Sequence, residues 1–255
     1  MKRLLLSIAL TLAAGQALAL GNFADVTLYD RAEQRTLPVY WHEGRAYVVG
    51  RPGNEYQITV RNRAGLDVLA VVSVDGVNVV SGETASASQS GYVIDSWRAM
   101  DIKGWRKSLA RTAAFYFTEL PDSYAARTGR PDNVGVIGVA LFRRKWEEPP
   151  MSFNSPFILK DRAERADSAA GSVQSAPRAQ EKKENSLGTG HGRGETSQAR
   201  YVGFERATAA PEEVITLYYD SYANLAARGI IGREYHRHEP QPFPQRFVPD
   251  PPSRW

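Results

Sequence analysis

The chain has 255 residues, of which 42% are hydrophobic and 24% charged, and it contains no cysteine. This composition is that of a globular protein, and the length allows one domain with extensions or two small domains. The absence of cysteine excludes disulfide bonds, a thiol nucleophile and any cysteine-ligated metal or iron–sulfur centre. The formal net charge is +4, and two of the basic residues that contribute to it lie in the N-terminal segment.

Residues 1–19 have the pattern of a secretory signal peptide. Lys2 and Arg3 precede an apolar stretch at 4–14, and Ala17-Leu18-Ala19 fits a cleavage site with small residues at both ends. We therefore expect an exported chain that begins near Leu20, is periplasmic or secreted, and has no integral membrane span after cleavage. A retained N-terminal anchor is the alternative. Without Lys2 and Arg3, 30 basic residues face 28 acidic ones, a net charge of +2, which predicts no nucleic-acid partner.

Residues 20–150 predict a β-sandwich domain. Residues 37–41 and 46–49 are β-forming runs joined by a loop that contains glycine, and Asp75-Gly76 separates two further β-branched runs, which is a strong hairpin signal. Residues 55–63 alternate strictly between apolar and polar side chains, as in a half-buried antiparallel strand. Further strands are expected at 91–94, 99–102, 113–118 and 134–143. This series predicts a mainly β fold, an antiparallel sandwich of the jelly-roll or immunoglobulin-like kind.

The composition changes after residue 150. Residues 151–199 are dominated by small and charged side chains, and no aromatic residue lies between 161 and 199, so we expect a flexible polar linker. The glycine-rich run at 188–194 lies in this linker and superficially resembles a phosphate loop. A phosphate loop needs a strand before it and a helix after it, and the sequence predicts neither here.

Residues 200–232 predict a small C-terminal element that docks on the sandwich. Residues 214–219 are strongly β-forming, which favours a strand to Asp220 followed by a short helix with Ser221 as N-cap and Gly229 just past its end. A continuous helix from Pro211 is the alternative. Residues 233–255 are rich in proline and predict an extended tail.

Several blocks resemble a family of exported proteobacterial proteins of unknown function. They are residues 51–56, 74–85, 104–108, 113–118 and 120–131, with a second match from 218 through 230. The resemblance implies an exported protein from a Gram-negative bacterium. It implies no activity, because the family has no assigned reaction.

Catalytic and metal motifs are weak in this sequence. No Gly-x-Ser-x-Gly elbow is present, and Glu147-Glu148 and Glu212-Glu213 would point to opposite faces of a strand. His236 and His238 are the one candidate pair of metal ligands, but their spacing and the neighbouring prolines favour a solvated tail. We therefore expect no cofactor and no bound metal.

A group of aromatic and basic residues is the candidate binding surface. Trp97, Trp105, Arg106, Tyr124 and Arg127 could form a stacking face with hydrogen-bond donors, suited to a sugar ring or a protein hot spot. The alternative places Trp105 and Tyr116 in the core and the basic residues at solvated edges. The polar loops 81–91 and 121–133 could form a binding rim if both lie at one end of the sandwich.

These features favour a non-catalytic exported module that binds a protein or a glycan in the periplasm or cell envelope. A hydrolase of envelope or extracellular polymers, with carboxylates from separate strands, is one alternative. An assembly component that uses the linker and the proline-rich tail is another.

Overall fold

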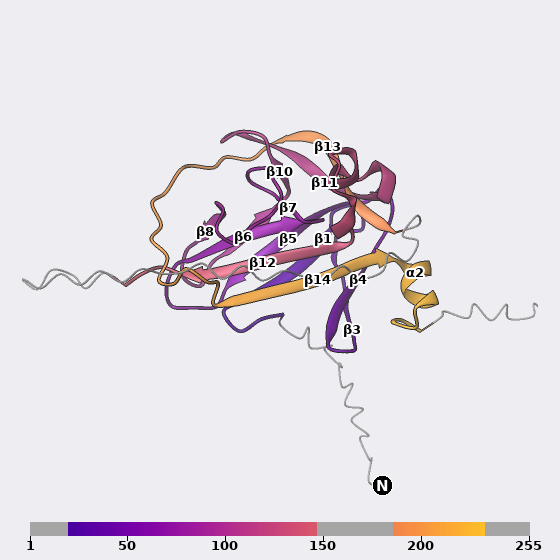
Figure 1. The fold of residues 1–255 in the computed structure, drawn as a ribbon, viewed down its shortest axis with the longest axis horizontal. Helices are drawn as coiled ribbons and strands as arrows, with labels where there is room; N and C mark the ends of the chain where they lie inside the picture. Colours follow the sequence, from indigo (N-terminus) through magenta and orange to yellow (C-terminus); the bar gives the residue numbers. More distant parts are fainter. Residues whose placement is uncertain (1–19, 147–185, 233–255) are drawn as a thin grey trace, which may run out of the picture.

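The computed structural model of the chain describes residues 20–146 and 186–232. These residues form two β-sheets that enclose a shared core (Figure 1). The mainly β fold predicted from the sequence is confirmed, and the arrangement is that of a sandwich. Within the described residues every strand pair is antiparallel except β4 with β14, which run parallel.

The first sheet has the order β10-β11-β5-β1-β2, with β13 added on β11 and β9 on β5. Its strands are β1 (Ala24–Asp30), β2 (Arg35–Thr36), β5 (Glu55–Asn62), β9 (Ala99–Ile102), β10 (Gly104–Arg106), β11 (Arg111–Glu119) and β13 (Leu187–Thr196). The second sheet has the order β3-β4-β14-β12-β6-β7, with β8 on β6. Its strands are β3 (Val39–His42), β4 (Arg45–Gly50), β6 (Val68–Val74), β7 (Val77–Asn78), β8 (Tyr92–Ile94), β12 (Val136–Arg143) and β14 (Glu213–Ser221).

Alternate residues of facing strands build the core between the sheets. Tyr56, Ile58 and Val60 of β5 are fully buried, and the residues between them are only partly buried, which confirms the predicted alternation. They share one apolar cluster with Ile137 and Leu217 of the second sheet. Full burial of each aliphatic side chain of this kind contributes about 1.5–3 kcal/mol.

The predicted hairpin turns are confirmed. Asp75 and Gly76 have φ values of 53° and 74° and join the paired residues Val74 and Val77. Positive φ at both central residues defines a type I′ turn, whose twist matches that of the flanking strands. The β3–β4 hairpin turns in the same way, with φ values of 49° at Glu43 and 71° at Gly44.

The C-terminal element is a strand followed by a helix, as favoured from the sequence. β14 runs between β4 and β12, and α2 (Tyr222–Ala227) follows it directly. The Ser221 side chain accepts a hydrogen bond from the backbone N–H of Asn224 at 3.2 Å, which is the predicted N-cap. Gly229 has a φ of +71° just past the helix end. α2 packs Leu225 against Tyr47 on the outer face of β4.

The prediction for residues 187–196 was wrong, because these residues form strand β13 along β11. Its glycines permit close packing of small and aromatic groups: a Cβ added at Gly188 would lie 2.6 Å from the Ser123 Cβ, and one at Gly190 would lie 2.2 Å from the Tyr116 ring. The high glycine content of β13 therefore reflects the lack of space for side chains at these positions, and not flexibility of the chain. The rest of the predicted linker from 151 to 185 and the predicted tail at 233–255 lie outside the described residues.

A one-turn helix, α1 (Tyr124–Arg127), lies against β13 between the 3₁₀ turns η1 (Leu120–Asp122) and η2 (Pro131–Asn133). The Ser123 hydroxyl accepts a bond from the backbone N–H of Ala126 at 3.1 Å and caps α1. Across the described residues, neither α1 nor α2 nor any other helix has the length and apolar character needed to cross a membrane.

Gly188→Ala should destabilise the protein by about 1–3 kcal/mol, because the new methyl group overpacks Ser123 and Val134. Gly203→Ala is the matched control, since a Cβ at Gly203 has no neighbour within 4 Å, and it should change the free energy of unfolding by less than about 1 kcal/mol. Urea denaturation measures both. Equal stability of the two variants would contradict the close packing of β13.

Candidate functional site

A buried polar network links the two sheets beside β13. The Asp75 carboxylate accepts hydrogen bonds from the Tyr219 hydroxyl at 2.5 Å, the backbone N–H of Thr189 at 2.8 Å and that of Gly135 at 2.9 Å. The Thr189 hydroxyl in turn lies 2.6 Å from the Tyr219 oxygen and 2.7 Å from the Tyr56 oxygen. Each of the four side chains in this network is fully or almost fully buried.

Burial dominates the electrostatics of this network. Loss of solvation raises the pKa of Asp75 from its ordinary value of 3.8 to about 6, although the Tyr219 hydroxyl and the backbone N–H donors act in the opposite direction. Burial also raises the pKa values of Tyr56 and Tyr219 well above their usual range. Because the network is enclosed within the core, its role is to hold β13 against the second sheet.

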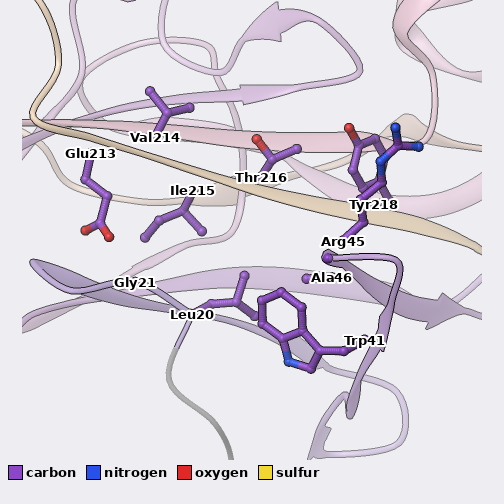
Figure 2. A pocket seen from close by; sticks show the side chains of 11 residues that line it. Leu20, Gly21, Trp41, Arg45, Ala46, Glu213, Val214, Ile215, Thr216 and Tyr218 are labelled. Atoms are coloured by element: carbon purple, nitrogen blue, oxygen red, sulfur yellow. The ribbon is translucent and has the colours of Figure 1, made fainter.

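A groove of about 340 Å³, the edge groove, lies along the first residues of β14, where β4 does not yet pair with that strand. Its walls are the N-terminal residues Leu20 and Gly21, the β3–β4 hairpin with Trp41 and Arg45, and the first residues of β14 (Figure 2). In Figure 2 the indole of Trp41 lies next to Leu20, and Arg45 lies alongside Tyr218.

The edge groove follows a strand edge that has no partner among the described residues. β12 pairs with β14 from residue 213 to 218, whereas β4 pairs with β14 only from Leu217 onward. The Tyr219 N–H donates to the Gly135 carbonyl at 3.0 Å. Since backbone groups alternate in direction along an antiparallel strand, those of Val214 and Thr216 point away from β12, toward the groove.

Two large apolar side chains at this edge are exposed. Trp41 is 50% exposed and Val214 is 60% exposed, so both offer apolar surface to a ligand. The Arg45 guanidinium lies 5.8 Å from the centre of the Tyr218 ring. This exposed cation is the charged group at the hairpin end of the groove.

Glu213 closes the other end of the groove. Its two carboxylate oxygens accept the backbone N–H groups of Asn22 at 2.6 Å and Phe23 at 2.8 Å. These bonds satisfy the carboxylate and fix the N-terminal segment against β14.

The structure does not bring the predicted aromatic and basic group together as one exposed face. Trp105 is only 3% exposed and donates from Nε1 to the Gly190 carbonyl at 3.0 Å, so it is a core residue, as the alternative interpretation proposed. Trp97 is exposed beside Gly65, and no ring contact joins it to Trp105 within the described residues. Arg106 holds the carbonyl of Ser197 at 2.6 Å.

The other members of that group lie near one another at the α1 end. Tyr124 packs between Trp105 and His191, with ring centres 4.7 and 5.7 Å away, and Arg127 is exposed in the last turn of α1. The two predicted polar loops do meet here, because Arg130 donates to the Gly82 carbonyl at 3.1 Å. The binding role predicted for these residues stays a prediction.

A second cavity, of about 230 Å³, is lined by two carboxylates, Asp132 and Asp220. One oxygen of Asp220 accepts bonds from the Leu187 N–H, the Ser221 N–H and the Asn224 amide. Asp220 is therefore engaged in holding β13 and the start of α2. The predicted hydrolase with carboxylates from separate strands stays a prediction.

Within the described ranges, no group of three or more histidine or carboxylate side chains is arranged to hold a metal ion. The candidate ligands His236 and His238 lie outside those ranges.

Sequence reasoning placed Trp41 and residues 214–219 in strands but missed the groove between them. The groove depends on where the parallel pairing of β14 with β4 begins, and this pairing joins residues about 170 positions apart in the chain and has no local signal.

Comparison with known proteins identifies no relative: no family model, no curated protein and no solved structure matches the chain.

The buried carboxylate predicts a pH dependence of stability. Because the pKa of Asp75 is higher in the folded than in the unfolded chain, its stabilisation is complete below 3.8 and is lost as the pH rises to about 6. The full loss corresponds to about 3 kcal/mol. His191, whose pKa is lowered by burial and by the charges of Lys107 and Arg127, acts in the opposite direction, so a comparison with Asp75→Asn at each pH isolates the effect.

Urea denaturation across this pH range should show the stability of the native chain falling relative to that of Asp75→Asn. Parallel pH profiles of the two proteins would show that Asp75 has an ordinary pKa.

Thr189→Val should destabilise the protein by about 1–3 kcal/mol, because it removes the hydroxyl between two buried tyrosine oxygens. Thr112→Val is the matched control on the adjacent strand. The Thr112 hydroxyl is buried and has no hydrogen-bond partner among the described residues, so its replacement by a methyl group should be neutral or stabilising. Thermal unfolding of both variants checks this, and a larger loss in Thr112→Val would contradict the assigned bonds.

Proposed function

We propose that this protein is a non-catalytic, exported β-sandwich module that binds an extended segment of a partner protein in the edge groove. The observation that carries the proposal is the unpaired edge of β14 at residues 213–216, next to the half-exposed indole of Trp41.

Strand addition is the binding mode that fits this edge. An extended segment pairs its backbone with an open sheet edge, and pockets beside the edge select its side chains. Natural edges are usually covered or carry charged residues that prevent such pairing. Here the exposed residues at the open edge, Val214 and Thr216, are uncharged, and the neighbouring aromatic residue is Trp41. These features favour a polypeptide over a glycan, because a glycan has no backbone N–H and C=O groups at the regular spacing that pairs with a strand edge.

The side chains indicate the chemistry of the partner segment. Trp41 and Val214 favour an apolar side chain that packs against them. Arg45 favours a carboxylate at the hairpin end of the groove. The partner segment is therefore extended, with an apolar anchor and an acidic residue.

The proposed location is the periplasm or the cell exterior of a Gram-negative bacterium. The signal-peptide pattern of residues 1–19 supports export, and the resemblance to exported proteobacterial proteins supports a Gram-negative source. A chain without cysteine needs no disulfide bond in that oxidising compartment and depends on its core.

A random peptide library displayed on phage tests the groove. The chain, produced from the full-length gene and purified from a Gram-negative host, should select peptides that bind as synthetic molecules. Trp41→Ala should weaken their binding by about 2 kcal/mol, close to thirtyfold in Kd. Thr216→Pro removes a backbone donor at the open edge, where proline is tolerated, and should weaken binding at least about tenfold.

Trp97→Ala is the matched control, since Trp97 is 65% exposed and lies outside the groove. It should leave the Kd unchanged, and circular dichroism should show that every variant is folded. The proposal would be overturned if the library yielded no binding peptide, or if the selected peptides bound both groove variants with unchanged Kd.

A further inference from the structure

The backbone nitrogen of Leu20 is hydrogen-bonded to the carboxylate of Asp25. Its N–H donates to Oδ1 of Asp25 at 3.2 Å, and its side chain is only 5% exposed within the main apolar core. A residue fixed through both its backbone nitrogen and its side chain has a defined position. The fold therefore includes Leu20 as a structural residue at the wall of the edge groove.

The residues after Leu20 are fixed along the same path. Gly21 has a φ of +119°, and a Cβ at this position would lie 2.4 Å from Cδ1 of Ile215, so only glycine permits the chain to pass this close to β14. Glu213 then accepts the next two backbone N–H groups. These contacts hold the segment from Leu20 to Phe23.

The sequence places a cleavage pattern immediately before this fixed residue, at Ala17-Leu18-Ala19. We infer that the bond between residues 19 and 20 is the processing site, and that the α-ammonium group of Leu20 docks on the carboxylate of Asp25 in the mature protein. An export peptidase would hydrolyse this bond: water adds across it, the carbonyl carbon gains an oxygen as a carboxylate, and the amine leaves with a proton as an ammonium group.

Processing strengthens the contact that is already present. An amide nitrogen offers Asp25 one neutral donor, whereas an ammonium group offers three donors and a positive charge, and charge-assisted hydrogen bonds are about twice as strong as neutral ones. Because Leu20 and Gly21 line the edge groove, the docked terminus also fixes the wall of the proposed binding site. This inference rests on the exported location in the proposed function, but not on the identity of the ligand.

Two measurements test it on the protein expressed from its full-length gene in a Gram-negative host. Intact-mass analysis and N-terminal sequencing of the periplasmic protein should identify Leu20 as the first residue. Any other mature terminus, or an uncleaved chain, would overturn the processing site.

Thermal unfolding then tests the docking. Asp25→Asn should lower the Tm of the processed protein by about 2–4 °C, and the control Asp95→Asn, which removes an equal charge from an exposed residue, should not. A chain that keeps Ser-Gly before Leu20 after processing replaces the ammonium group with an amide, and in that chain the effect of Asp25→Asn should shrink by at least half.

An effect of Asp25→Asn that is the same with and without the Ser-Gly extension would overturn the docking while leaving export intact. Peptide binding by the groove is tested separately, by the effect of Trp41→Ala on the peptide Kd. The two proposals can therefore fail independently.

Discussion

The two sheets depend on one buried carboxylate at the point where they meet. Asp75 belongs to a turn of the second sheet, yet one of its oxygens accepts the backbone N–H of Thr189 in the first. Such a group is costly to bury, as the raised pKa of Asp75 shows. It is tolerated because two backbone donors and the Tyr219 hydroxyl satisfy its oxygens. The polar junction therefore fixes the relative position of the sheets, which apolar packing alone specifies less sharply.

The same junction explains how β13 is covered. The N–H groups of Leu187 and Thr189 donate to the carboxylates of Asp220 and Asp75, so two side chains satisfy backbone donors that a neighbouring strand would otherwise take. A sheet edge covered in this way is closed to further pairing. The first residues of β14 have no equivalent cover within the described chain. This contrast between a covered and an open edge in one molecule is the structural basis of the proposal that the groove accepts an added strand.

Several carboxylates in the described part of the chain receive backbone N–H groups. Asp75 and Asp220 hold β13, Glu213 holds the segment after Leu20, and Asp25 holds Leu20 itself. Acidic residues that are occupied in this way are unsuited to acid–base catalysis, which needs a carboxyl group within reach of a substrate proton.

The sequence by itself determined the features that depend on neighbouring residues. Alternation in β5, positive φ at Asp75-Gly76 and the Ser221 cap were predicted correctly, because each rests on contacts within a few positions. It also identified Trp41 as a strand residue, though not as part of a groove. Only the tertiary structure decided that the glycine-rich residues 187–196 form a strand, that β14 runs parallel to β4, and that the turn residue Asp75 is buried. Those outcomes join residues more than a hundred positions apart, as between Asp75 and Thr189, and local patterns carry no information about such pairs.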